Sequence, residues 1–153
     1  NDLRFGQIST NANTINEGSF DDGGYSIRWA ADTLDNLNFP TSGYYGNLTF
    51  YDSLTALGAS NNFSTLSLNA AVPYTWGKQT LIPRVILSGR LSGDLGLQDL
   101  FLLGGFLNLS GYQIGQVSGQ YAALGELIYM YRLDDASAAF TIPLYAGGSL
   151  EVG

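Results

Sequence analysis

The stretch TLSLNAAVPYTW, residues 65–76, decides the fold class of this chain. Every second side chain in it is apolar, and most positions between them are small and polar; the apolar set is Leu66, Leu68, Ala70, Val72, Tyr74 and Trp76. Successive side chains of a β-strand point to opposite faces of the sheet. A period of two therefore predicts a strand with one apolar face and one polar face.

The same alternation continues along the chain. It is present in residues 25–32, 46–54, 81–91, 121–133 and 140–152, and more weakly in residues 3–9. A few apolar residues, Ile82, Ile86, Ile128 and Met130, interrupt the polar side of their segments. Short turns at 34–43, 77–78 and 134–137 alternate with longer polar or glycine-rich segments at 10–24, 53–62 and 92–120. About seven strands joined in this way predict an antiparallel up-and-down meander.

The composition indicates that water is not the only medium facing this sheet. Of the 153 residues, 45% are hydrophobic and 12% are charged, whereas average globular chains carry about 25% charged residues. The polar faces carry Ser, Thr, Asn and Gly, and Tyr and Trp gather near the strand ends. No segment approaches the roughly 18 apolar residues of a membrane-spanning helix. These features favour an all-β transmembrane barrel over a soluble β-sandwich, which stays open as the alternative.

Residue types that most enzymes and metal sites require are missing. The chain has no His and no Cys, which removes Ser-His and Cys-His catalysis and imidazole or thiolate metal ligation. A patatin-type hydrolase needs a Gly-x-Ser-x-Gly turn, and none is present, although Asp22-Gly23 matches the dipeptide of its dyad. We expect no catalytic residue, no cofactor and no metal. The net charge of −7, without a Lys/Arg cluster, argues against nucleic acid as a partner.

Residues 32–45, DTLDNLNFPTSGYY, resemble a short turn of the bacterial surface antigen barrels, the superfamily of outer-membrane assembly factors and two-partner-secretion translocators. Asp, Asn, Pro and Gly each fix a turn conformation, so their joint spacing is informative. An ordinary Asx/Pro turn is the alternative. The motif residues here are Asp32, Asp35, Asn36, Phe39, Pro40 and Gly43.

Residues 100–112, LFLLGGFLNLSGY, are similar to the loop that members of this superfamily insert into the barrel lumen. In the family it runs from a Phe-Leu-Gly-Gly segment to a Val-Arg-Gly-Phe/Tyr tip. The resemblance assigns a stem and a tip to this chain. The stem residues are Phe101, Gly104 and Gly105, and the tip residues are Leu109, Ser110, Gly111 and Tyr112.

The family's ion pair between loop and wall is predicted to be missing. Ser110 stands in place of the tip arginine, and alignment of the Phe-x-Asp-x-Gly partner strand with residues 144–148 puts Ala146 in place of the Asp. We therefore expect packing and neutral hydrogen bonds to hold the loop, with no carboxylate opposite Ser110. This combination is similar to the barrels fused behind patatin-like phospholipases, the type V autotransporters with a lipase passenger.

The resemblance implies a place in a larger barrel. Members have sixteen strands, so residues 1–153 are expected to be one segment of an outer-membrane barrel domain, about the seventh to the thirteenth strand. The chain begins at Asn1 with no charged-then-apolar signal, which we interpret as a mature or excised chain. Membrane lipid or detergent, and the remaining strands or further copies of the chain, are the implied partners. The implied location is the outer membrane of a Gram-negative bacterium.

These observations give a first hypothesis and two alternatives. The first is a barrel segment, not itself an enzyme, that anchors or exports a passenger protein. The second is the membrane anchor of a patatin-like phospholipase whose catalytic domain lies elsewhere, and the third is a soluble β-sandwich binding module. Five charged residues are predicted to face the lumen, where they either form a solvated wall or take part in a translocation path. They are Arg28, Arg84, Arg90, Glu126 and Glu151.

Overall fold

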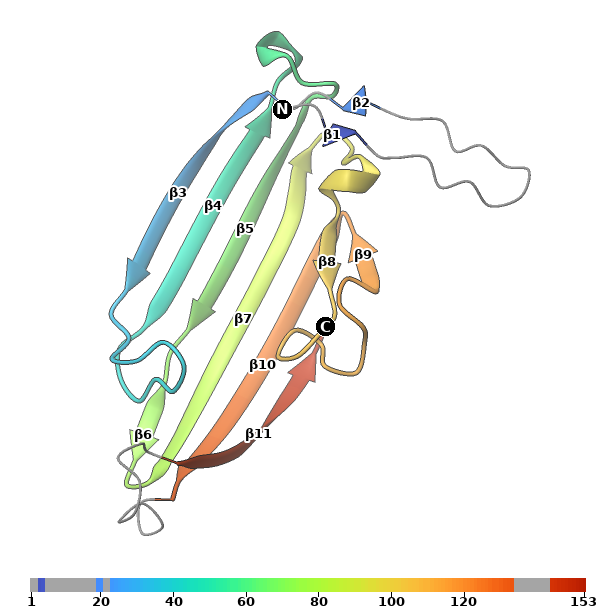
Figure 1. Ribbon diagram of the computed structural model, residues 1–153. Helices are drawn as coiled ribbons and strands as arrows, with labels where there is room; N and C mark the ends of the chain where they lie inside the picture. The colour runs from blue at the N-terminus through green and yellow to red at the C-terminus, as the bar shows by residue number, and fades with distance from the viewer. Residues whose placement is uncertain (1–2, 5–18, 21–22, 134–143) are drawn as a thin grey trace, which may run out of the picture.

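The computed structural model describes residues 3–4, 19–20, 23–133 and 144–153. Its long strands form one antiparallel sheet in the order β3-β4-β5-β7-β10-β11, and short β6 also pairs with β7. Figure 1 shows these strands side by side in a tilted, twisted sheet. The bounds are β3 (Gly24–Asp32), β4 (Tyr45–Ser53), β5 (Phe63–Ala71), β6 (Tyr74–Trp76), β7 (Gln79–Ser92), β10 (Tyr121–Arg132) and β11 (Tyr145–Val152).

This single sheet confirms the predicted fold class, an all-β, antiparallel, up-and-down and partial barrel. Strands that follow one another in the chain are neighbours in the sheet, as in a meander. A β-sandwich needs a second sheet stacked on the first, and the long strands of the described residues belong to one sheet. The soluble sandwich therefore does not fit the fold.

Two predicted strands differ from the observed ones. Residues 65–76 were expected to be continuous, but the strand is divided into β5 and β6 because Pro73 has no N–H to donate. Val72, between the two parts, still donates its N–H to the carbonyl of Pro83 at 3.2 Å. Both β5 and β6 therefore remain paired with β7. Of residues 3–9, only β1 (Leu3–Arg4) is described as a strand, and it pairs with β2 (Ser19–Phe20) outside the large sheet. The segments 5–9, 134–137 and 140–143 lie outside the described residues.

The longest described connection folds over one face of the sheet. It joins β7 to β10 and contains a 3-10 turn, η2 (Leu97–Asp99), and a small hairpin of β8 (Phe101–Leu103) and β9 (Val117–Gly119). Another 3-10 turn, η1 (Thr55–Leu57), joins β4 to β5. In Figure 1 the β8–β9 segment lies in front of β10, at the side of the sheet where the chain ends. This segment is the loop predicted to insert into the lumen.

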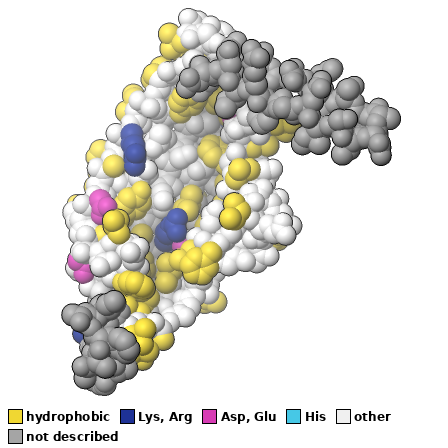
Figure 2. Space-filling view, in the orientation of Figure 1, with side chains coloured by type: hydrophobic (Ala, Val, Ile, Leu, Met, Phe, Trp, Pro, Cys, Tyr) yellow, Lys and Arg dark blue, Asp and Glu magenta, His cyan; other side chains and the backbone are white. Residues whose placement is uncertain are grey.

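The two faces of the sheet differ as the alternation predicts. Pairing places Trp29, Leu48, Leu68 and Leu87 in one row across β3, β4, β5 and β7, and Trp29 is 61% exposed. We call this the outer face. The opposite, inner face carries the loop, and Leu124 beneath it is 1% exposed. Figure 2 shows this inner face as hollowed along the strands and poor in hydrophobic side chains over its middle.

The residues that interrupt the polar alternation lie on the inner face. Ile82 pairs with Ile128, and Ile86 pairs with Leu124. Ile82 and Met130 are 4% and 7% exposed. An apolar side chain at these positions therefore does not face open water. None of the helices described in the structure is long and apolar enough to cross a membrane.

Candidate functional site

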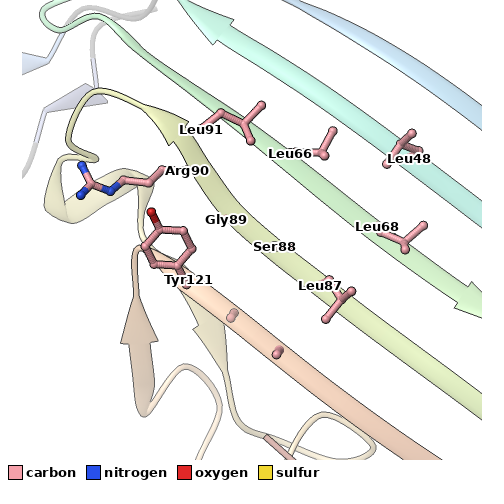
Figure 3. A pocket seen from close by; sticks show the side chains of 11 residues that line it. Leu48, Leu66, Leu68, Leu87, Ser88, Gly89, Arg90, Leu91 and Tyr121 are labelled. Atoms are coloured by element: carbon pink, nitrogen blue, oxygen red, sulfur yellow. The ribbon is translucent and has the colours of Figure 1, made fainter.

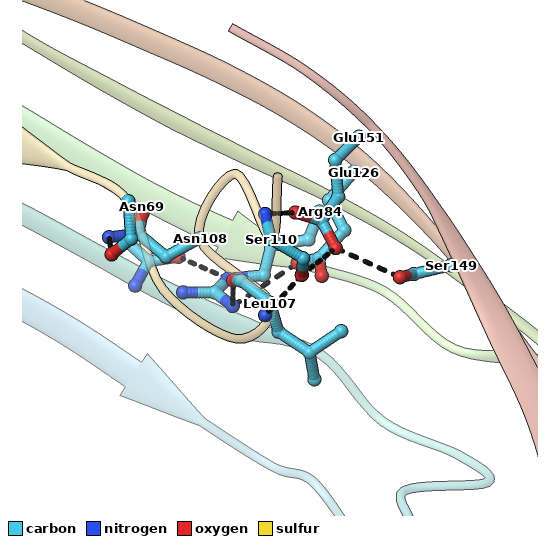
Figure 4. A network of polar contacts seen from close by, with 9 residues as sticks. Asn69, Arg84, Leu107, Asn108, Ser110, Glu126, Ser149 and Glu151 are labelled. Carbon is cyan, nitrogen blue, oxygen red and sulfur yellow. Dashed lines mark hydrogen bonds and ion pairs between the residues drawn. The ribbon is translucent and has the colours of Figure 1, made fainter. Parts of the chain in front are cut away.

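Three of the predicted lumen charges meet on the inner face. Glu126 of β10 pairs in register with Arg84 of β7 on one side and with Glu151 of β11 on the other. Arg84 Nη1 lies 3.2 Å from Glu126 Oε2. Arg84 Nε also donates to Asn69 Oδ1 at 3.4 Å. Figure 4 shows these residues beneath the loop; we call Arg84, Glu126 and Glu151 the wall triad.

Burial is unequal within the wall triad. The Glu126 side chain is fully buried, whereas 28% of the Arg84 side chain stays exposed. Glu126 Oε1 has no hydrogen-bond partner among the described residues. A buried carboxylate depends strongly on its cation. The ion pair with Glu126 therefore holds Arg84 on the wall, and other N–H groups of its guanidinium can bind further acceptors.

The tip of the loop binds the third member of the wall triad. Ser110 donates its backbone N–H to Glu151 Oε2 at 2.6 Å and its hydroxyl to Glu151 Oε1 at 2.8 Å. Ser149 donates to the same Oε1 at 2.9 Å. The expectation that no carboxylate lies opposite Ser110 is wrong. The alignment caused the error: with the wall acid at Glu151, the Phe-x-Asp-x-Gly pattern falls on residues 149–153, as Ser149, Glu151 and Gly153.

A second contact joins the loop to the wall through a carbonyl. Arg84 Nη1 donates to the carbonyl oxygen of Leu107 at 3.3 Å. The tip is held in shape by Leu107 N–H, which donates to Ser110 Oγ at 3.0 Å. Apolar side chains gather beside these bonds, because a Cβ at Gly153 would lie 3.3 Å from Leu109 Cδ1 and 3.5 Å from Leu124 Cδ1. The loop is thus anchored by a carbonyl, an N–H, a hydroxyl and one leucine.

The backbone of the loop is tightly folded. Gly104 has φ +124°, and a Cβ there would meet the Gln113 carbonyl oxygen at 2.0 Å. Gly105 is also in the positive-φ region, while nothing lies within 4 Å of a Cβ at Gly111. Leu107 and Leu109 have φ of 53° and 74°, which L-residues rarely adopt. The stem residue Phe101 pairs with Gly119 in the small hairpin, and Tyr112 at the tip is 48% exposed.

The other two predicted lumen charges lie apart from the wall triad. Arg28 on β3 donates from Nε to Asn47 Oδ1 at 3.0 Å. Arg90, near the end of β7, bonds to the carbonyl of Gly93 and to the Asp94 carboxylate. Its guanidinium also lies 6.0 Å from the centre of the Tyr121 ring. Arg28 therefore contacts the neighbouring strand β4, and Arg90 contacts the loop after β7 and Tyr121 of β10.

The turn motif is built from side chains that bind the backbone. Asp35 accepts N–H bonds from Thr41 at 2.8 Å and Ser42 at 3.1 Å, and a hydroxyl bond from Thr41. Asn36 accepts from Phe39 N–H at 3.0 Å, and Asp32 accepts from Leu34 N–H at 3.0 Å. Gly43 has φ +96°, and a Cβ there would meet the Thr33 carbonyl at 2.2 Å. These bonds fix a rigid turn between β3 and β4.

This turn crosses the inner face and reaches the last strand. The Phe39 ring stacks on the Tyr145 ring of β11, with centroids 4.8 Å apart and planes 9° from parallel. Pro40 is buried, and Thr75 of β6 donates its hydroxyl to the Thr41 carbonyl at 2.6 Å. Sequence reasoning found the turn but missed this contact, because no local pattern links Phe39 to Tyr145.

Comparison with known families decides the identity of this arrangement. The family model of the Omp85 superfamily domain matches residues 2–149. The chain belongs to the Omp85 superfamily. No curated protein matches it. The match ends before Glu151, although that residue holds the loop tip in this Omp85 domain.

Membership of the Omp85 superfamily indicates where the sheet is located. Omp85 proteins are outer-membrane β-barrels that act in assembly or secretion, in association with lipid and partner proteins. The Omp85 domain described here therefore lies in the outer membrane of a Gram-negative bacterium. β10 has 12 residues. At about 3.3 Å per residue and a tilt of roughly 45°, it spans close to the ~25 Å apolar band of a barrel.

The outer face of the Omp85 domain suits lipid. A shallow hollow of about 590 Å³ lies there, lined mainly by leucines of β4, β5 and β7 and by Tyr121. Figure 3 shows Leu48, Leu66, Leu68 and Leu87 standing out from their strands, with Tyr121 beside Gly89. A Cβ at Gly89 would lie 2.7 Å from the Tyr121 ring. The aromatic ring thus covers the glycine that would otherwise expose the backbone.

The inner face carries hydrogen-bonding groups that hold the loop. Within the described residues, no three His, Cys, Asp or Glu side chains gather as a metal site would require. Arg84 and Glu151 of the wall triad bind the loop by hydrogen bonds. Superfamily members are translocators or assembly factors. The site is therefore an anchor for the loop.

Proposed function

We propose that this Omp85 domain is part of an outer-membrane barrel that anchors a passenger protein and exports it. The observation that carries the proposal is the loop anchor: a separate segment lies on a polar inner wall and is held there by a few hydrogen bonds. Such a segment can leave without disturbing the pairing of the sheet. We further propose that residues 1–153 are one segment of the barrel domain, completed by other strands or by further copies.

Movement of the loop gives the test of export. Ser110 and Ser149 hydroxyls bond to the same oxygen of Glu151, and the chain has no native cysteine. The double substitution Ser110→Cys/Ser149→Cys should therefore form a disulfide that holds the loop on the wall. We expect oxidised cells to stop displaying the passenger, measured by protease shaving, and a reductant to restore display.

Two controls complete this experiment. Ser110→Cys alone should export equally under oxidising and reducing conditions, because it has no partner cysteine. Passenger display that is equal in the oxidised and reduced double variant would reject export through a loop-controlled lumen. The chain would then act only as an anchor.

The second candidate is the membrane anchor of a patatin-like phospholipase. Ser110 at the tip favours it, because the barrels fused behind such lipases resemble this chain there. The purified chain should hydrolyse no short-chain ester, since it contains neither His nor a Gly-x-Ser-x-Gly turn. Phospholipase activity of the full-length protein, lost on removal of a domain outside this chain, would favour the second candidate over a non-enzymatic passenger.

A further inference from the structure

The wall triad holds the loop mainly through main-chain atoms. Arg84 donates to the carbonyl of Leu107 at 3.3 Å, and Glu151 accepts the N–H of Ser110 at 2.6 Å. The one side-chain bond between loop and triad comes from the Ser110 hydroxyl, among the contacts of the described residues. The wall therefore presents a donor for a C=O group and an acceptor for an N–H group, which every peptide carries apart from the N–H of proline.

Arg84 and Glu151 also have partners on the wall itself. Arg84 remains paired with the fully buried Glu126 inside the wall, at 3.2 Å. Glu151 keeps the hydroxyl of Ser149. Release of the loop therefore separates no ion pair, and it frees one guanidinium donor and one carboxylate acceptor toward the lumen. Hydrogen bonds to charged groups are stronger than neutral ones.

The loop itself binds in a strained form. Leu107 and Leu109, on either side of the contact, have φ of 53° and 74°. L-residues adopt these angles only at a cost in energy. A polypeptide that reaches the same donor and acceptor without such strain competes well with the loop.

We propose that the wall triad is a binding site for polypeptide backbone, occupied at rest by the loop's own turn and taken by an extended polypeptide in transit. This inference rests on the proposed export function and names its substrate class, an unfolded chain recognised regardless of sequence. Arg84 binds its carbonyl and Glu151 binds its N–H, while the loop acts as the internal competitor.

The test uses full-length protein in liposomes and a short Gly-Ser peptide that carries a photoreactive group. A second peptide of the same sequence is methylated on its backbone nitrogens, which removes the N–H donors. The plain peptide should label the inner face of β10 or β11, and the methylated peptide should not. Ser110→Ala weakens the loop's hold on Glu151, so labelling should rise roughly tenfold.

Matched variants identify the site. Ser67→Ala removes a hydroxyl on the same face but outside the wall triad, and should leave labelling unchanged. Adding Glu151→Gln to Ser110→Ala should reduce labelling severalfold, because the charged acceptor is lost. If Ser110→Ala does not assemble, the wild-type protein gives the same contrast between the two peptides at higher peptide concentration.

The outcomes separate this inference from the export function. Equal labelling by plain and methylated peptide, or no labelling at all, would overturn backbone recognition even if the passenger reaches the surface. Labelling of the plain peptide alone, with no passenger at the surface, would support the site and reject export.

Discussion

At the scale of single residues, Glu126 has the most demanding environment in the described protein. Its carboxylate is fully buried, and its positive partner is Arg84. Removing one member of such a pair leaves an uncompensated charge, whereas removing both does not. The stability of the wall should therefore depend on the pair being kept or lost together.

This gives a prediction for two variants. Arg84→Met should lower the free energy of unfolding by about 3–5 kcal/mol. Arg84→Met/Glu126→Leu should recover much of that loss, because no charge is then buried alone. Urea unfolding in detergent, followed by the gel-mobility shift of the barrel, measures both; a double variant no more stable than Arg84→Met would contradict the explanation.

Asp35 makes a second residue-level prediction, in the turn between β3 and β4. The hydroxyl of Thr41 and the N–H groups of Thr41 and Ser42 lower the pKa of Asp35 from 3.8 to about 2. Since the folded-state pKa is lowered, the stabilisation is present above pH 3.8 and is lost as pH falls toward about 2. Proteolysis by an acid protease should therefore cut the turn faster across this interval. Asp35→Asn, which has no charge to lose, should show no such step.

The residue scale also shows where sequence reasoning stops. The sequence points to Ser110 as a loop-tip residue and to Glu151 as a wall charge, but the motif alignment puts Ala146, not Glu151, opposite Ser110. Short motifs align only to within a few residues, and the chain in and around β11 carries two adjacent glycine-ended patterns, at 144–148 and 149–153. The pairing register, Glu126 with Glu151, removes that ambiguity, and register is a property of the folded sheet.

At the scale of elements, alternation located β3, β4, β7 and β10 closely. It located them well because side chains of a strand alternate by geometry, whatever the tertiary context. The inner-face exceptions Ile82 and Met130 could not be explained from local sequence. Both are buried, and burial on one face of a sheet depends on tertiary packing that a local pattern does not contain.

The assignment of faces leads to a prediction for β5. Leu68 lies on the outer face, and neighbouring Ser67 lies on the inner face between Thr49 and Ser88. Leu68→Arg should destabilise the protein by about 2–4 kcal/mol near the bilayer midplane, while Ser67→Arg should be tolerated. Unfolding in liposomes compares the two. Asn69 is unsuitable as the inner-face control because Arg84 binds it, and equal losses at 67 and 68 would reverse the assigned faces.

At the scale of the whole molecule, two segments cover the inner face. The loop is anchored at the wall triad, and the β3–β4 turn reaches across to Tyr145. The hollow of the inner face seen in Figure 2 lies between these two segments, and we call it the trough. The sequence could indicate that both segments exist, but it could not indicate what they touch, because the contacts join strands far apart in the chain.

The last prediction concerns the stacking of Phe39 on Tyr145. Phe39→Ala should lower the free energy of unfolding by about 3 kcal/mol or less, since it removes a stacked ring that is only partly buried. Leu37→Ala in the same turn is the control, because Leu37 is 84% exposed and should change little. Chemical unfolding measures both variants. Equal effects would show that the ring pair adds no stability.

The stacked rings of Phe39 and Tyr145 also bear on the order of folding. Neighbouring strands of a meander meet through contacts that are short in sequence, and such contacts form early because little loop-closure entropy opposes them. The ring pair joins the first hairpin of the large sheet, β3–β4, to the last described strand, β11, so it has a high contact order. It can form only after β11 has been synthesised and has added to β10. The stack is therefore a late step in assembly, and a chain that stops before Tyr145 leaves this end of the trough unsealed.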